Sequence, residues 1–270
     1  YELLPLLEAS PDVKLETVAP LGGQIMFRPN FLFPPFDNVK MRQALFYLMD
    51  PKELLIASAG DEKYITECVS AFICGPGQPE PMKPALPNIE KAKELIKEAG
   101  YDGRKIVFLN ANDQSELMRV ATVFTKRMKA AGLNIDQQDM DWATLTTRRS
   151  NKSDPATSAS GWNMFTTSRP GVSAVNPIMN SALDTSCDQK NWFGWPCDEK
   201  IQALREKYLR AATREERRAV EDEINQQFVE SLPYITIGKI LRPTVAARKN
   251  VTGFMLANRL VPWNISKTDN

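Results

Sequence analysis

The stretch from residue 88 to residue 137 decides the fold class. It reads NIEKAKELIKEAG (88–100), IVFL (106–109), QSELMRVATVFTKRMKAAG (114–132) and LNIDQ (133–137). The first and third of these segments carry apolar residues at helical spacing and end at a glycine, as helices commonly do. The second and fourth are short apolar or alternating segments, which are typical of strands. This helix–strand–helix–strand succession predicts an α/β fold in which helices pack on a sheet.

The same patterns predict further elements on both sides of this stretch. The predicted helices cover residues 38–49, 51–58, 142–149, 198–212 and 213–231, and the predicted strands cover residues 13–18, 24–28, 232–238 and 244–248. Two long segments, 61–87 and 151–195, are rich in turn-forming and polar residues, and we expect them to be mostly loop.

The composition excludes several classes of function. The 270 residues include 34 Lys+Arg and 33 Asp+Glu, a net charge of +1, and no histidine. A near-neutral chain is not a general electrostatic binder of nucleic acid. The lack of histidine excludes His-dependent triads, His general bases and His-containing metal sites. No glycine-rich phosphate loop, nucleophile elbow or Cys-x-x-Cys motif occurs, so we expect no cofactor, no metal site and no catalytic residues.

The four cysteines form two close pairs in the sequence, Cys68/Cys74 and Cys187/Cys197. Pairs with short separations form disulfides in oxidising compartments. Free buried thiols are the alternative, because cysteine is a common core residue. The polar loops around both pairs favour disulfides, since free thiols there would be exposed.

Aromatic residues gather in two segments that are predicted to be loops. These are Gly161-Trp162-Asn163-Met164-Phe165 and Trp192-Phe193-Gly194-Trp195-Pro196. Aromatic side chains beside Asn, Thr and Gly are typical of a pocket with apolar walls and a few hydrogen-bonding groups. The alternative is that these rings fill the core beneath the loops, and the sequence leaves both interpretations open.

Four segments, in order along the chain, resemble the bacterial extracellular solute-binding proteins of family five. This family contains the peptide-, dipeptide- and nickel-binding subunits of import transporters. The segments are Phe27–Asn30 followed by Pro34–Leu45, the helix and turn Asn88–Gly103, the pair Gly161-Trp162, and Leu232–Ile235. Each segment alone is a weak signal, whereas four in the family's order are specific.

The resemblance implies a periplasmic-binding-protein-like fold of class II, with a mixed sheet and helices packed on it. Family members are typically about twice this length, so the chain is expected to be the C-terminal half. Residues 1–31 are then strands of the first lobe and hinge, residues 32–235 the second ligand-binding lobe, and residues 236–270 the return to the hinge and first lobe. The chain starts at Tyr1 without a signal peptide. We expect a processed or partial chain of a periplasmic protein.

The resemblance also implies a function: capture of a peptide or similar small solute between two closing lobes, for an ABC importer. The expected partners are the solute, the permease and its ATPase, without nucleic acid, and the protein is expected to be a monomer and not an enzyme. The predicted ligand-binding residues are Asn30, Trp162, Asn163, Phe165, Thr166, Thr167, Trp192 and Trp195. Two alternatives stay open: a peptide receptor or chaperone-like protein that does not serve transport, and a hydrolase with an unrecognised Lys/Asp site.

One position departs from the family pattern. Peptide-binding relatives carry an aspartate three residues after the Trp of Gly-Trp, where it pairs with the amino group of the ligand, and this chain has Phe165 there. An ammonium group without a partner is costly to bury. We therefore predict that the full-length protein does not prefer ligands with a free amino terminus. The alternative is that Asp184 or Asp188 takes over this role.

Overall fold

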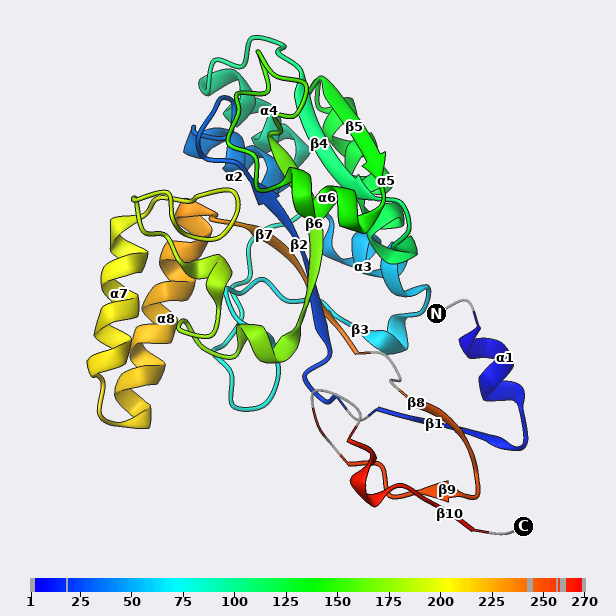
Figure 1. The fold of residues 1–270 in the computed structure, drawn as a ribbon. Helices are drawn as coiled ribbons and strands as arrows, with labels where there is room; N and C mark the ends of the chain where they lie inside the picture. The colour runs from blue at the N-terminus through cyan, green and yellow to red at the C-terminus, as the bar shows by residue number, and fades with distance from the viewer. Residues whose placement is uncertain (1–2, 18, 242–244, 256, 258–260, 269–270) are drawn as a thin grey trace.

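A six-stranded mixed sheet forms the centre of the molecule (Figure 1). The computed structural model describes residues 3–17, 19–241, 245–255, 257 and 261–268. The strand order is β3-β7-β2-β6-β4-β5. Strand β4 runs parallel to β5 and β6, whereas β2 is antiparallel to β6 and β7, and β3 is antiparallel to β7. The strands are β2 (Gly23–Pro29), β3 (Ile65–Thr66), β4 (Ile106–Ala111), β5 (Ile135–Met140), β6 (Met164–Pro170) and β7 (Ile235–Ile240).

Helices cover this sheet and confirm the predicted α/β class. Helix α2 packs on α4, α3 packs on α5 and β7, and α7 and α8 form a separate antiparallel pair (Figure 1). The helices are α2 (Val39–Leu48), α3 (Pro51–Ala59), α4 (Ile89–Glu98), α5 (Ser115–Ala130), α6 (Trp142–Arg148), α7 (Glu199–Arg210) and α8 (Arg214–Ser231). None of the helices in the described part of the chain has the length and hydropathy of a membrane span.

Most of these helices begin where the sequence places a capping residue. A side-chain oxygen of the N-cap residue accepts a backbone N–H of the first turn, which satisfies a donor that the helix cannot satisfy itself. This holds at Asn38, Asp50, Asn88, Asp141, Asp198 and Thr213. At α8 the side chain of Glu216 also accepts the backbone N–H of Thr213, so the predicted capping box is confirmed. The caps fix where the helices start, and so they fix the lengths of the loops between them.

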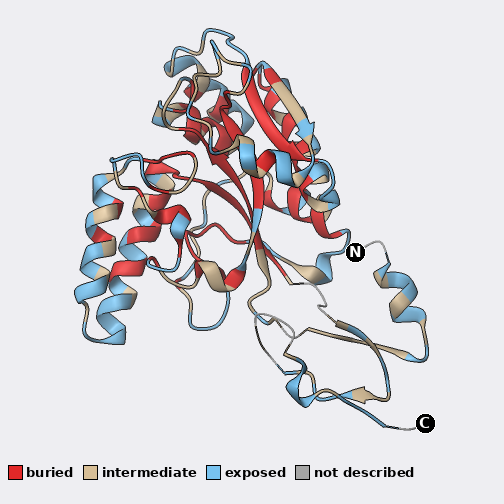
Figure 2. Ribbon diagram, viewed as in Figure 1, coloured by how far each residue is buried: buried red, intermediate tan, exposed pale blue. Residues whose placement is uncertain are grey.

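The core lies on both faces of the sheet, as Figure 2 shows by burial. On β2, Ile25 and Phe27 join one hydrophobic cluster, whereas Met26, which points to the opposite face, joins the other. Successive side chains of a strand point to opposite faces. The first cluster lies under α2 to α5, and the second lies under α7 and α8. Strand β2 is therefore the centre of both layers.

The prediction that residues 151–195 are mostly loop is wrong for β6. This strand lies between β2 and β4 and pairs with β2 over seven residues, with Phe27 opposite Thr166. Buried Thr166 and Thr167 continue the strand, so the segment lacks the alternation of apolar and polar residues that marks a strand in a sequence. Its hydrogen bonds to β2 and β4 hold it in the sheet. The rest of the segment is irregular except for short turns at Gly171–Ala174 and Ser181–Leu183.

A second group of elements projects from the main body and contacts it through Glu8, which accepts hydrogen bonds from Lys63 and Tyr64 (Figure 1). Helix α1 (Leu4–Ala9) is followed by β1 (Val13–Glu16), which pairs with β8 (Val245–Arg248), and β9 (Val251–Thr252) pairs with β10 (Ser266–Lys267). These five elements contain no buried residue among those described, as the tan and blue ribbon in Figure 2 shows. Val18 and Thr244, at the ends of two predicted strands, lie outside the described residues.

The sheet contains residues from both sides of the predicted domain boundaries. Strand β2 precedes residue 32 and most of β7 follows residue 235, yet both are central strands of the main body. The assignment of the flanking residues to a first lobe stays a prediction.

Candidate functional site

Most of the predicted ligand-binding residues lie inside the main body. Trp192 is half-buried. The others expose at most 5% of their surface, and they are Asn30, Trp162, Asn163, Phe165, Thr166, Thr167 and Trp195. The ring centroid of Trp162 lies 5.2 Å from that of Phe165 and 5.7 Å from that of Trp195. The two aromatic segments therefore meet, and their inner rings form part of the hydrophobic core.

Asn30 and Asn163 join three strands at one end of the sheet. The side-chain amide of Asn30 donates to the carbonyl of Trp162 at 2.9 Å, and its oxygen accepts the N–H of Leu32 at 3.0 Å. Asn163 accepts the N–H of Val107 at 2.8 Å and donates to the carbonyl of Pro34 at 3.0 Å. Both amides are thus satisfied within the chain, and their contact with a ligand stays a prediction.

The outer rings surround a guanidinium group and form what we call the Arg149 cluster. It consists of Arg149 with Trp142, Phe165, Trp192 and Phe193. The guanidinium carbon lies 5.4 Å from the ring centroid of Trp142, 5.6 Å from those of Phe165 and Trp192, and 4.7 Å from that of Phe193. Phe165 is buried beneath the group, whereas the other members are partly exposed. Aromatic faces attract a cation at these distances.

Arg149 has no polar partner for its charge among the described residues. Its Nε atom is buried and makes no hydrogen bond, and no described carboxylate forms an ion pair with the group. Burial lowers the pKa of Arg149 from its ordinary value, and no neighbouring charge opposes this effect. Its neighbour Arg148 differs, because it donates to the carbonyls of Ala159, Ser160 and Gly161. The Arg149 cluster is therefore a partly open, apolar site with one unsatisfied cation.

Sequence reasoning missed three members of this cluster: Trp142, Arg149 and Phe193. Trp142 and Arg149 are seven residues apart on the predicted helix 142–149, which places them two turns apart on the same face. That spacing is the signal that could have identified the pair. Phe193 lies in the second aromatic segment, but the sequence alone does not show that its ring is more exposed than that of Trp195.

Arg28 holds the loop that carries Trp192 and Phe193 against the sheet. Its side chain is fully buried and donates to the carbonyls of Phe193 (2.6 Å), Ala182 (2.9 Å), Pro233 (2.9 Å) and Trp192 (3.2 Å). Burial lowers the pKa of Arg28 to about 9, so the group remains charged at neutral pH. A charged donor to four carbonyls fixes the loop firmly.

Two further features close the same loop. The N–H of Phe31 donates to the carbonyl of Gly194 at 2.8 Å. The predicted disulfide between Cys187 and Cys197 is present, with Cα atoms 4.5 Å apart, and so is the disulfide between Cys68 and Cys74, with Cα atoms 6.3 Å apart. The loop from 187 to 197 is thus held at its ends and at its middle.

The two acids considered as alternative amine anchors have partners within the chain. Asp184 forms an ion pair with Arg205 at 3.1 Å. Asp188 accepts the backbone N–H of Lys190 at 3.0 Å and the hydroxyl of Ser186 at 3.1 Å, and these hydrogen bonds, the backbone one foremost, hold the pKa of Asp188 below its ordinary value. Neither carboxylate pairs with Arg149.

The described residues hold no cluster of ligands for a metal ion. The most buried lysine, Lys239, has its pKa lowered by burial and forms no ion pair with a described carboxylate. The buried Glu221 pairs with Arg218 on α8 instead. The Lys/Asp ion pairs among the described residues, Lys63 with Asp61 and Lys105 with Asp136, have side chains that are at least 35% exposed.

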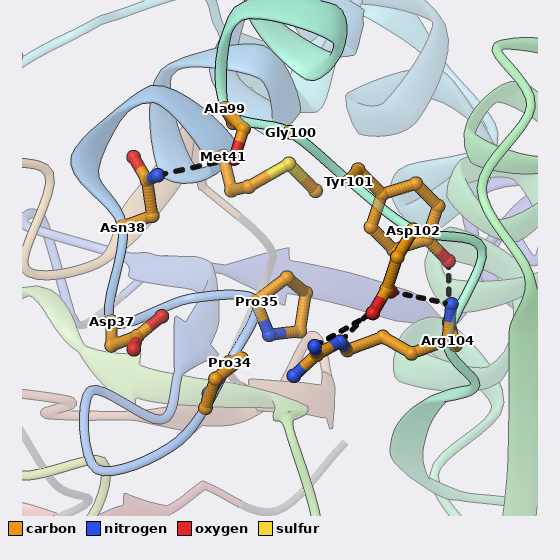
Figure 3. A pocket seen from close by; sticks show the side chains of 10 residues that line it. All are labelled: Pro34, Pro35, Asp37, Asn38, Met41, Ala99, Gly100, Tyr101, Asp102 and Arg104. Carbon is orange, nitrogen blue, oxygen red and sulfur yellow. Dashed lines mark hydrogen bonds and ion pairs between the residues drawn. The ribbon is translucent and has the colours of Figure 1, made fainter.

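A separate hollow of about 320 Å³ lies where two of the family-like segments meet (Figure 3). It is lined by the Pro34–Pro35 turn, the start of α2 and the turn after α4. Asp102 and Arg104 form an ion pair at 2.7 Å on its wall, and Asn38 contacts the carbonyl of Ala99 at 3.5 Å. The charges of Asp102 and Arg104 satisfy one another, in contrast to that of Arg149.

Comparisons with known proteins agree with this architecture. The chain is 33% identical, over 98% of its length, to the probable peptide ABC transporter periplasmic-binding protein y4tO of Sinorhizobium fredii, and covers 50% of that protein. The chain thus spans about half the length of this relative.

Two solved structures share the fold. The oligopeptide-binding protein AppA from Bacillus subtilis, in complex with a nonapeptide, has a TM-score of 0.78 and 16% identity, covering 99% of this chain and 55% of that one. The binding protein AgaA from A. tumefaciens, in complex with agropinic acid, has a TM-score of 0.77 and 17% identity, covering 100% and 55%.

A family model matches most of the chain directly. Residues 2–177 match the model described as bacterial extracellular solute-binding proteins, family 5 Middle. The matched range includes the sheet strands β2 to β6 and three members of the Arg149 cluster, Trp142, Arg149 and Phe165. The chain therefore belongs to family 5 of the bacterial extracellular solute-binding proteins.

Proposed function

We propose that this chain is the C-terminal part of the solute-binding subunit of a bacterial ABC importer. The observation that carries the proposal is the Arg149 cluster: a partly exposed group of aromatic rings around an unsatisfied cation, in a chain of the solute-binding family. Ligand sites of this kind combine apolar walls with a few placed polar groups. The cluster would form one wall of a cleft that a first lobe completes.

The solute is a peptide or a similar small organic molecule. One relative is named for peptide transport, and the structural neighbours hold a nonapeptide and agropinic acid. The half-exposed ring of Trp192 is the predicted residue best placed to touch such a ligand. Trp162, Phe165 and Trp195 would act from beneath, by setting the positions of the outer rings.

The remaining parts of the proposal follow from the family. The subunit works in the periplasm, where the two disulfides are stable. It acts as a monomer without chemistry of its own and delivers its ligand to a permease driven by an ATPase. A peptide receptor or chaperone-like protein that does not serve transport is the second candidate, because the same site would serve it.

Two measurements on the full-length protein that contains this chain test the proposal. Native mass spectrometry of the purified protein should identify a bound small molecule, and deletion of its gene should abolish uptake of that molecule. Binding without loss of uptake would favour the receptor. The isolated chain should bind the same molecule much more weakly, since half of the cleft is missing and the ligand stays half-solvated. Equal affinities would show that the whole site lies within this chain.

A further inference from the structure

We propose that Arg149 binds a carboxylate of the ligand, and that the ligand needs no free amino group. This inference rests on the proposed function and names the ligand class for the same site. The expected ligand is a small organic acid with an apolar or planar part, which the rings of Trp142, Trp192 and Phe193 would cover.

The first argument is that Arg149 lacks the hydrogen-bond partners that three other fully or partly buried arginines have. Arg28 donates to four carbonyls, Arg42 donates to the carbonyls of Phe36, Asp37 and Ser231, and Arg148 donates to three. Arg149 has a buried Nε without a partner and no ion pair among the described residues. Only Nε of Arg149 is buried, and the side chain is partly exposed, so its other N–H groups can be reached by a ligand from outside the chain.

The second argument concerns geometry. The four rings surround the guanidinium at 4.7–5.6 Å and restrict its orientation without using its N–H groups. Those N–H groups stay available to a ligand. A planar guanidinium held in place matches a carboxylate with two parallel hydrogen bonds, and the apolar surroundings strengthen the attraction.

The third argument is the sign of the charges. Beneath the site, the residue that faces Arg149 is Phe165, which carries no charge. Asp184 is paired with Arg205, and no described carboxylate forms an ion pair with Arg149. The cluster thus presents one cation that no described carboxylate neutralises, which favours an anion over an ammonium group.

A carboxylate of the first lobe could occupy the same position, and the experiment separates this possibility from ours. The full-length protein is titrated by calorimetry with the tripeptide Ala-Phe-Ala in four forms: unmodified, N-acetylated, C-terminally amidated, and modified at both ends. Thermal shift with N-acetylphenylalanine and its amide adds a smaller probe pair. We expect acetylation to leave the affinity within about 2-fold, and amidation to weaken it by about 10- to 100-fold, the range of a charge-assisted hydrogen bond.

Variants assign the effect to Arg149. Arg149→Gln should abolish the preference for the acid over the amide and leave binding of the amide within about 2-fold of its original value. Arg149→Lys should keep part of the preference, since it keeps the charge but loses the planar pair of donors. The control is Arg210→Gln, which removes an arginine whose side chain is 80% exposed on α7 and should change nothing.

The inference is wrong if neither acid binds the full-length protein better than its amide, or if Arg149→Gln keeps the preference. Either result would be expected if a carboxylate of the first lobe pairs with Arg149. These failures differ from a failure of the proposed function. In that case the purified protein would carry no small molecule, and its gene would be dispensable for uptake.

Discussion

Replacement of Gly194 by alanine tests how firmly the aromatic loop is held to the sheet. Gly194 lies between Phe193 and Trp195 with φ +92°, and a Cβ there would lie 2.5 Å from the carbonyl oxygen of Pro29 and 2.8 Å from Nε of Arg28. Gly132 provides the matched control. It has the same φ of +92°, and a Cβ at that position would meet no atom within 4 Å.

The difference between the two variants isolates the close approach of the loop. Alanine in the left-handed region costs about 1–2 kcal/mol, so Gly132→Ala should lose about that much. At Gly194 the oxygen of Pro29 belongs to β2 and cannot move, so the loop must shift. That shift breaks the bond from Phe31 N–H to the Gly194 carbonyl and the bond from Arg28 to Phe193. Groups left unsatisfied cost about 1–3 kcal/mol each, so with two bonds broken Gly194→Ala should lose about 2–6 kcal/mol more than the control.

Urea unfolding followed by tryptophan fluorescence measures both variants against the parent protein, with the free energy of unfolding compared at equal slope. The near-ultraviolet circular dichroism of Gly194→Ala should also change, because Trp192 and Trp195 flank the substituted position. Equal losses for the two variants, within about 0.5 kcal/mol, would refute the reasoning, since the loop would then tolerate the extra atom as easily as an open turn does.

Three further outcomes follow from the same contacts. Arg28→Met should cost about 3–5 kcal/mol in urea unfolding, because it removes four hydrogen bonds to carbonyls, of which only that of Trp192 keeps another donor among the described residues, the N–H of Trp195. Arg210→Met should stay within about 0.5 kcal/mol of the parent. Replacing both Cys187 and Cys197 by serine should cost about 2–3 kcal/mol on the chain-entropy estimate for a loop of this length, and thiol titration of the unreduced, denatured parent should find no reactive cysteine. Burial raises the pKa of Glu221 although its pair with Arg218 acts in the opposite direction, so ionisation of Glu221 destabilises the folded state. The stability of Glu221→Gln should therefore rise relative to that of the parent as the pH rises above the ordinary carboxyl pKa. A stability difference that does not change with pH would contradict this.

The sequence predicted best those elements whose signals are local. The stretch 88–137 became α4, β4, α5 and β5, with ends shifted by at most three residues. Its helices have strong apolar periods and clear end signals, and these depend on the residues within a few turns. The mixed sheet and the family were likewise expected from motifs in their order along the chain.

Strand β6 was missed because its stability is not local. Its residues from Met164 to Thr167 are buried, although two of them are threonines, and Arg169 follows. What makes this segment a strand is its position between β2 and β4, with both edges paired. The sequence shows no alternation of apolar and polar residues here, because a central strand is buried on both faces.

The candidate site was half predicted for a related reason. Residues of both aromatic segments were predicted to bind the ligand, and the structure shows that the segments meet, but the sequence could not divide their rings into an inner and an outer layer. Trp162 and Trp195 became core, whereas Trp192 and Phe193 stayed partly exposed. That division depends on the hydrogen bonds from Arg28 on β2 to the carbonyls of Trp192 and Phe193. Nothing near residues 192–195 in the sequence indicates these bonds.

The residue at position 165 affects how the charge of Arg149 can be used. Phe165 stands where the family resemblance expects an aspartate, and its ring lies 5.6 Å from the guanidinium of Arg149. A carboxylate so near would pair with the arginine and occupy its N–H groups. An aromatic ring instead supports the cation by packing and leaves its N–H groups unused. The proposed site thus has a cation at residue 149 and no acid at residue 165, and we predict that it binds an anionic group in preference to an ammonium group.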